Sequence, residues 1–155
     1  MAGPENALIL SCARGQSSDG LLDPAGGLDW DYVLSMAAAH QVTSLLYWNL
    51  HRNCRDRVPP EILQRLRERF LAGVARQERL TAELFRILGH FEENGIPALP
   101  FKGPVLAHTL YEDPALREYV DLDILVPKRA AFRALRAVRS SRRGRCAAIR
   151  PPSRR

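Results

Sequence analysis

The feature that most constrains the fold is an apolar periodicity that continues without a break from about Glu61 to Glu93. Apolar residues recur there at steps of three, four or six, as on one face of a long helix: Leu63, Leu66, Phe70, Val74, Leu80, Leu84, Leu88 and Phe91. The other face is rich in Arg and Glu, which is typical of a solvated surface. Pro59-Pro60 favours a helix start and Asn94-Gly95 favours a stop. The chain must therefore fold around one long amphipathic helix.

Upstream of this helix, a shorter apolar pattern predicts a second one. Asp29 can cap a helix that runs to about His51, and its apolar residues include Val33 and Leu46. Residues 1–27 are rich in Gly, Ser and Pro and lack any period, so we expect a poorly ordered N-terminus there. Residues 28–95 then form a helical region.

The spacing of apolar residues is no longer helical after Asn94-Gly95. Residues 96–101 are short and apolar, which suits a strand, and their two prolines each remove a backbone donor. Lys102-Gly103-Pro104 predicts a tight turn, followed by a short helix from Val105 to Tyr111. Residues 119–126 alternate as a strand does: Val120, Leu122, Ile124 and Val126 point one way, and Tyr119, Asp121, Asp123 and Leu125 point the other.

The two carboxylates of this strand are the first sign of chemistry. Asp121 and Asp123 are two residues apart, which places them on one face, roughly 6.5–7 Å apart at the backbone. Two like charges beside apolar residues are costly unless a cation neutralises them, and hard oxygen ligands favour Mg²⁺ or Mn²⁺. The competing interpretation is an edge strand with both aspartates in water. Spacing alone leaves both interpretations open.

A wider motif surrounds the carboxylates. An apolar strand leads to Lys-Gly, a short helix ends in Tyr, an Arg follows, and then Asp and apolar residues alternate: Lys102-Gly103-Pro104-Val105-Leu106-Ala107, Leu110-Tyr111, Arg117 and Asp121-Leu122-Asp123-Ile124-Leu125-Val126. This combination resembles the uncharacterised bacterial nucleotidyltransferases of the DNA polymerase beta superfamily. The helical part around Trp30, Ala37, His40 and Leu45-Leu46 is similar to their N-terminal region. The resemblance covers about residues 28–138.

The resemblance implies a role for each motif residue. The positions of Asp121 and Asp123 are those that hold the metal ions, Mg²⁺ or Mn²⁺, which bridge a nucleoside triphosphate. Lys102 and Gly103 stand where the superfamily usually has a Gly-Ser or Gly-Gly turn for the phosphates. They lack its serine hydroxyl, and Pro104 has no backbone N–H, so Lys102 would supply charge and Gly103 a close backbone approach. Arg117 has two open roles: it contacts the phosphates, or it pairs with an aspartate.

The sequence departs from the family pattern after the second carboxylate. The superfamily normally has further strands there, one of which carries a third carboxylate, but no Asp or Glu follows Asp123. Residues 128–138 still predict an amphipathic helix, with Phe132, Leu135 and Val138 inward. Residues 139–155 have no pattern that builds a core, and we expect a disordered basic tail. A truncated or frame-shifted gene is our hypothesis, and an uncovered sheet would favour self-association.

Charge is divided unevenly along the chain. Residues 128–155 contain eleven basic residues and no acidic one, whereas residues 1–127 contain twelve basic and seventeen acidic residues. The tail can bind nucleic acid or another polyanion non-specifically, or it is simply solvated. No run approaches the roughly 18 apolar residues of a membrane span, so we expect no membrane partner. Cys12, Cys54 and Cys146 are far apart and form no CxxC pair, and a reducing cytoplasm is therefore the expected location.

These patterns predict an α+β fold in which N-terminal helices precede an incomplete mixed sheet of nucleotidyltransferase type, with residues 96–138 as a partial catalytic core. The implied activity is transfer of a nucleoside monophosphate from a nucleoside triphosphate to an unknown acceptor, impaired in this chain. The alternative is a non-catalytic helical interaction module, or a vestigial fragment, in which Asp121 and Asp123 hold no metal.

Overall fold

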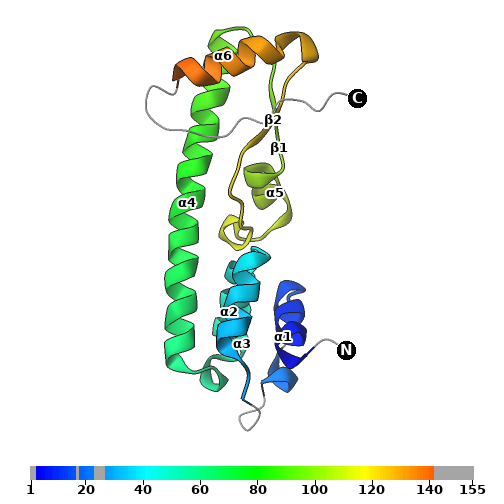
Figure 1. Cartoon of the computed structure of the whole chain (residues 1–155), viewed down its shortest axis with the longest axis vertical. Coiled ribbons are helices and arrows are strands. Elements are labelled where there is room, and N and C mark those ends of the chain that lie inside the picture. Colours follow the sequence, from blue (N-terminus) through cyan, green and yellow to red (C-terminus); the bar gives the residue numbers. More distant parts are fainter. Residues whose placement is uncertain (1–2, 17, 23–26, 142–155) are drawn as a thin grey trace.

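The computed structural model describes residues 3–16, 18–22 and 27–141. One long helix runs the length of the molecule, with three helices packed at one end and a small sheet with two helices at the other (Figure 1). The elements in chain order are α1 (Pro4–Ala13), α2 (Trp30–Ala39), α3 (Thr43–Asn53), α4 (Pro60–Glu93), β1 (Leu99–Phe101), α5 (Gly103–Leu110), β2 (Asp123–Leu125) and α6 (Ala131–Ser141).

The long helix α4 has the predicted bounds to within one residue. It contains 34 residues, which corresponds to about 50 Å. Pro60 occupies its first turn, where the missing N–H costs nothing. At its end Gly95 has a φ of 59°, and the Ile96 N–H donates to the Phe91 carbonyl at 2.8 Å. This is a Schellman motif, so Asn94-Gly95 is confirmed as the helix stop.

The N-terminal segment differs from the expectation of poor order. Pro4–Ala13 forms α1, and Leu8 and Cys12 are buried against α2 and α3. The Ser18 hydroxyl contacts the Cys12 sulfur at 3.3 Å and donates to the Asn49 side-chain oxygen at 3.2 Å, so a polar contact adds to the apolar one. The stretch escaped prediction because it is short and its apolar residues do not form a clear stripe.

The helix predicted from Asp29 to His51 is interrupted in the structure. Asp29 does cap α2, because its carboxylate accepts from the Tyr32 N–H at 2.9 Å. The chain then turns at Gln41, whose φ is 56°, and the Val42 N–H donates to the Ala37 carbonyl at 2.9 Å. The break is a second Schellman motif, with Gln at the left-handed position where Gly is usual. Because no Gly marks this position, the sequence did not predict the end of the helix.

The sheet consists of β1 and β2, which are antiparallel in the described residues. Leu99 pairs with Leu125, Pro100 with Ile124, and Phe101 with Asp123. Both strands are shorter than predicted: prolines flank and interrupt β1, and a bend at Asp121 precedes β2. The α+β class is confirmed, whereas the mixed sheet of nucleotidyltransferase type stays a prediction.

The last helix, α6, faces the molecule only partly as predicted: Val138 packs inward, but Phe132 does not. Phe132 is 83% exposed rather than inward, and α6 packs through Ala130, just before the helix, and through Ala134 and Ala137. Small side chains let α6 lie close to α4 and leave the large aromatic ring outside. Helix α6 also continues to Ser141, so residues 139–141 are helical rather than part of a tail. The rest of the predicted tail, 142–155, lies outside the described residues.

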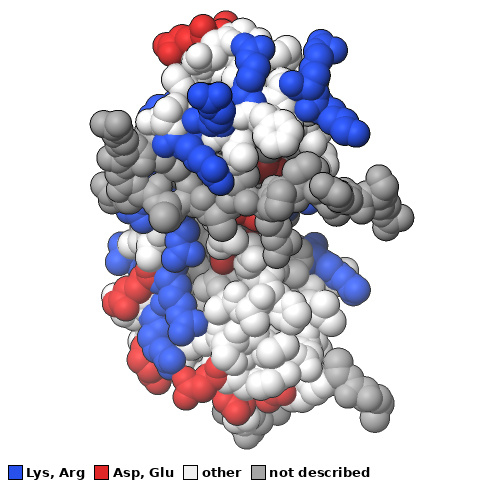
Figure 2. All heavy atoms as spheres, turned by 45° about the horizontal axis from the view of Figure 1, so that its top comes forward, with Lys and Arg blue, Asp and Glu red and all other residues white. Residues whose placement is uncertain are grey.

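Two apolar clusters result, one at each end of α4. The larger lies among α1, α2, α3 and the start of α4, and the smaller lies among the end of α4, the strands and α6. Figure 2 shows basic side chains both along the flank of α4 and over the end formed by α6. Within the described part of the chain, no helix has the length and apolar character needed to span a membrane.

Candidate functional site

The pairing of β1 with β2 brings the Lys-Gly turn to the carboxylates. Because Phe101 lies opposite Asp123, the next residue, Lys102, emerges beside that carboxylate. The Lys102 ammonium lies 3.7 Å from the Asp123 carboxylate oxygen, and both side chains are about half exposed. The same ammonium lies 5.4 Å from the centre of the Phe101 ring, a cation–π distance. The strand pairing therefore places the Lys102 cation beside Asp123, one of the two acids.

Gly103 continues this arrangement towards the other acid. In an antiparallel pair, one step beyond Lys102 runs towards Asp121, and a Cβ on Gly103 would lie 3.5 Å from the Asp121 backbone oxygen. The φ of Gly103 is 29°, a value that side chains rarely tolerate. Gly103 also begins α5, whose first N–H groups have no partner within the helix. The positive end of α5 therefore lies against the strand of Asp121 and Asp123.

The backbone of Lys102 is strained. Its φ and ψ are 59° and −141°, a combination that belongs almost entirely to glycine. Such a conformation costs on the order of 1–3 kcal/mol and persists only where its surroundings enforce it. Here β1 on one side and α5 on the other hold the Lys102 backbone in this conformation. The Leu106 N–H donates to the Lys102 carbonyl at 3.2 Å. A charged residue thus occupies a backbone conformation that glycine would adopt at lower cost.

The surroundings of the two aspartates favour the second of the two interpretations, an edge strand with both side chains in water. Leu122, Ile124 and Val126 pack against the smaller apolar cluster, so Asp121 and Asp123, which alternate with them, point away from it. Neither is buried: Asp121 is exposed and Asp123 is partly exposed. The cost of burying two charges therefore gives no argument for a metal. Among the described residues, no group of three or more His, Cys, Asp or Glu side chains gathers at one point.

Arg117 lies on the segment that leads to Asp121. Its Nε is buried without a hydrogen-bond partner, and within the described chain it forms no ion pair with an aspartate. Its backbone carbonyl accepts from the Gln77 side-chain amide at 2.9 Å. Of its two predicted roles, pairing with an aspartate is absent from this arrangement. The other predicted role, contact with the phosphates, stays a prediction.

Residues that position the segment were not identified from the sequence. The Tyr119 hydroxyl lies 2.9 Å from the Thr81 hydroxyl and donates to the Gln77 carbonyl at 3.3 Å. The Glu118 carboxylate accepts from the Ser44 N–H at 2.7 Å, in the first turn of α3. Gln77 and Thr81 stand one helical turn apart near the middle of α4, and that polar spacing was the available signal.

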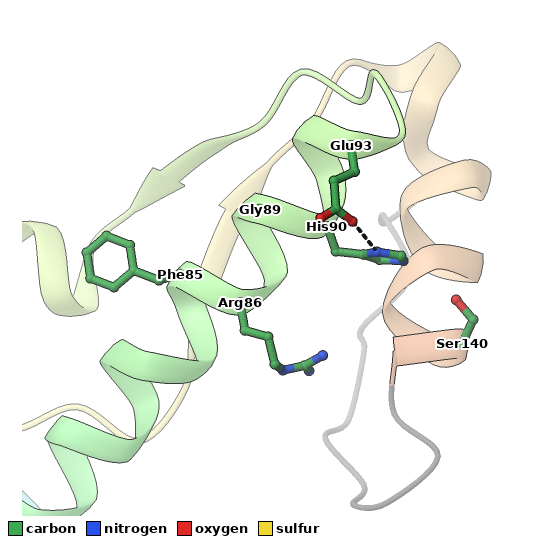
Figure 3. Close-up of a pocket in the computed structure, with 6 residues that line it drawn as sticks. All are labelled: Phe85, Arg86, Gly89, His90, Glu93 and Ser140. Carbon is green, nitrogen blue, oxygen red and sulfur yellow. Dashed lines mark ion pairs between the residues drawn. The ribbon is translucent and has the colours of Figure 1, made fainter.

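A pocket of about 520 Å³ lies elsewhere, between the outer flank of the end of α4 and Ser140 of α6 (Figure 3). Its charged groups are already engaged, because Arg86 pairs with Glu83 at 2.6 Å and the His90 ring lies 3.5 Å from the Glu93 carboxylate. The hydrogen bond that Arg86 donates to Glu83 also raises the pKa of Arg86 above its ordinary value. None of Lys102, Gly103, Arg117, Asp121 and Asp123 lines this pocket. The predicted site is an open surface beside α5.

Comparison with known proteins bears on this surface. Neither the curated proteins nor the solved structures gave a match. A family model described as an uncharacterised nucleotidyltransferase matches residues 26–141, which include all the predicted site residues. Because the match covers well over half of the chain, this protein belongs to that family of uncharacterised nucleotidyltransferases.

Proposed function

We propose that the surface formed by the Lys102-Gly103 turn and the strand of Asp121 and Asp123 binds a nucleoside triphosphate with a divalent metal. The observation that carries the proposal is the 3.7 Å contact between Lys102 and Asp123, made across paired strand ends in a nucleotidyltransferase chain. To this contact the proposal adds the second carboxylate, Asp121, and the N-terminus of α5. Nucleotide transfer needs such a combination, because its catalysis is mainly positioning and charge neutralisation.

The donor set fits the proposed metal. Two carboxylates that face solvent, with room for water and phosphate oxygens, are the incomplete oxygen shell in which Mg²⁺ is usually held. Asp121 and Asp123 would hold Mg²⁺ or Mn²⁺. When bound, such an ion neutralises charge on the phosphates and on the attacking oxygen.

The remaining residues would act on the phosphates directly. Lys102 offers a flexible ammonium, and Gly103 lets a phosphate approach the N–H groups that begin α5. Arg117 offers a guanidinium whose Nε has no partner among the described residues. The acceptor hydroxyl must also lose a proton, and the family resemblance places a third carboxylate in that task. We propose that this chain performs the transfer weakly, because only two strands of such a sheet are present in the described residues.

One observation favours a second candidate function. Only two acids gather at the site in the described residues, and no Asp or Glu follows Asp123 in the sequence. A chain that binds a partner through its helices, without catalysis, would have the same composition. Metal-dependent nucleotide binding separates the two functions.

The test is thermal unfolding with a nucleoside triphosphate and Mg²⁺ or Mn²⁺. We expect the two together to raise the melting temperature, because a ligand that binds only the folded state stabilises it. The double variant Asp121→Asn, Asp123→Asn should lose that rise and keep its own melting temperature without ligand. The exposed pair Asp31→Asn, Glu92→Gln is a charge-matched control far from the site. Equal ligand-induced rises in all three proteins would show that the nucleotide binds elsewhere.

A further inference from the structure

The outward side of α6 carries charge that the proposed site does not use. Helix α6 packs through alanines, and at helical spacing the opposite side forms one stripe, which continues back into the preceding turn. We call it the α6 stripe, and it consists of Lys128, Arg129, Phe132, Arg136 and Arg139. All five residues are exposed. Figure 2 shows this end of the molecule with basic side chains gathered over α6.

The four cations of the stripe are not neutralised locally. Within the part of the chain that the structure describes, none of them forms an ion pair. The neighbouring Arg133 is engaged differently, because its guanidinium donates to the Asn94 carbonyl at 2.6 Å. No acidic residue follows Asp123 in the sequence, so the charge along α6 is of one sign. Like charges one turn apart destabilise a helix slightly, and of the four cations only Arg139 lies in the last turn of α6, where a cation favours the helix dipole.

Phe132 stands in the middle of these cations. It lies three residues after Arg129 and four before Arg136, and its side chain is 83% exposed. A phenylalanine in water gives up roughly 1.5–3 kcal/mol of burial free energy, and its neighbours here are cations rather than apolar residues. Alternating cations and an exposed ring suit a ligand with phosphates and flat bases, because arginines contact the phosphates and the ring stacks on a base.

We propose that the α6 stripe binds single-stranded nucleic acid without strong sequence preference. Charge complementarity selects a polyanion, and the exposed ring selects one whose bases are unpaired. The inner side of α6 lies against Leu122, Ile124 and Val126, whereas Asp121 and Asp123 point away from that cluster. The stripe is therefore separate from the proposed nucleotide site, and the proposal holds whether or not the chain transfers nucleotides.

The experiment measures fluorescence polarisation of a labelled mixed-sequence oligonucleotide with the full chain and its variants. Phe132→Ala should weaken binding of the single strand about five- to tenfold, the loss expected for one stacked base. Binding of inorganic polyphosphate should be unchanged, because polyphosphate has no bases. Arg129→Gln with Arg136→Gln should weaken binding of both ligands and lower the slope of log affinity against log salt by roughly 1.4.

The matched control is Arg76→Gln with Arg79→Gln, which removes the same charge from exposed positions of α4. The arginines of 142–155 are present in every variant, so their contribution cancels in the comparison. The control should keep the affinity and salt slope of the parent. Equal losses in the control and the stripe variant would overturn the proposal, because binding would then follow net charge alone. Loss of anionic vesicle binding on Phe132→Ala, without loss of oligonucleotide binding, would assign the stripe to a membrane and would also overturn it.

Discussion

Lys102 combines strain with a charge at the candidate site. Its φ of 59° and ψ of −141° suit glycine, and its ammonium lies beside Asp123. Lys102→Gly removes the strain, at some cost in unfolded-state entropy, so we expect the free energy of unfolding to rise by about 1 kcal/mol. The same change removes the charge offered to the phosphates, so the nucleotide-induced rise in melting temperature should shrink. Urea titration and thermal unfolding measure the two effects.

Lys102→Ala is the control for this prediction. Alanine keeps a Cβ and therefore keeps the strain, while it removes the same charge. It should lose the response to nucleotide and gain no stability. If the alanine and glycine variants were equally stable, the conformation of Lys102 would not be strained in the folded protein.

Cys12 provides a prediction about pH. Burial raises the pKa of its thiol to about 11, although the hydrogen bond with Ser18 acts in the opposite direction. In the unfolded chain the thiol ionises near pH 9, so between pH 9 and 11 the unfolded state loses a proton that the folded state keeps. The stability from this group is complete below pH 9, and roughly 2 kcal/mol of it is lost by pH 11.

The measurement is urea unfolding at about pH 8 and about pH 11 for the parent chain and for Cys12→Ala. Other groups titrate in this range, so the informative quantity is the difference between the two proteins. The variant is expected to be less stable than the parent at the lower pH because it leaves a small cavity. The difference between their free energies of unfolding should become smaller at the higher pH. If the difference in the free energy of unfolding between the parent and the variant were the same at both pH values, the Cys12 thiol would ionise alike in the folded and unfolded states.

At this scale the sequence predicted which residues lie together, whereas their chemistry stays a prediction. Lys102, Gly103 and Asp123 were predicted to lie together, because a turn and an alternating strand carry local signals. The exposed Asp121 and the partly exposed Asp123 agree with the competing interpretation of an edge strand with both aspartates in water. Gln77 and Glu118 were missed because their partners lie 40 and 74 residues away, a separation that no local pattern encodes.

At the scale of elements, the helices with strong periodicity were the most predictable. Helix α4 has its predicted length because its apolar residues repeat over many turns and both ends carry turn residues. Helix α1 was missed, and α2 and α3 were merged, because their boundaries depend on tertiary contacts. The orientation of α6 was predicted correctly for Val138 and wrongly for Phe132, because alanines fit closely against α4 and the large ring of Phe132 is outside.

Two helix ends allow the same motif to be tested in opposite directions. Gln41 and Gly95 occupy the same left-handed position in two Schellman motifs, with φ values of 56° and 59°. Gln41→Gly should raise the free energy of unfolding by about 1 kcal/mol, and Gly95→Ala should lower it by about the same amount. Space is not a factor at Gly95, because a Cβ there would meet nothing within 4 Å. Changes of the same sign in both variants, measured by chemical denaturation, would contradict the assigned motifs.

At the scale of the whole molecule, α4 joins two clusters that share few other contacts. The segment 117–119 links them, because Glu118 binds the start of α3 while Tyr119 binds the middle of α4. This segment leads directly into the strand of Asp121 and Asp123. The helical end of the molecule therefore fixes the position of the candidate site. The sequence patterns indicate the two regions but not the link between them, which depends on the side chains of Glu118 and Tyr119.

The completeness of the site decides whether the molecule can act as an enzyme. Two carboxylates can hold a metal, but an attacking hydroxyl must also be deprotonated and aligned. Among the described residues no third acid joins Asp121 and Asp123. Glu112, Asp113 and Glu118 all precede the strand, and Glu118 is already bound to Ser44. We therefore expect this chain to bind a nucleotide and to transfer it slowly or not at all.

The assay incubates the purified chain with a labelled nucleoside triphosphate, Mg²⁺ and a cell extract that supplies acceptors. Asp121→Asn is the matched variant, because it removes one metal-binding charge at an exposed position and leaves the apolar packing intact. Little labelled product is expected from either protein, together with nucleotide-dependent stabilisation of the parent alone. Product that forms with the parent and disappears with Asp121→Asn would contradict the prediction. In that case a group outside Asp121 and Asp123 must take the proton from the acceptor, and Glu112 and Asp113 would be the first residues to replace.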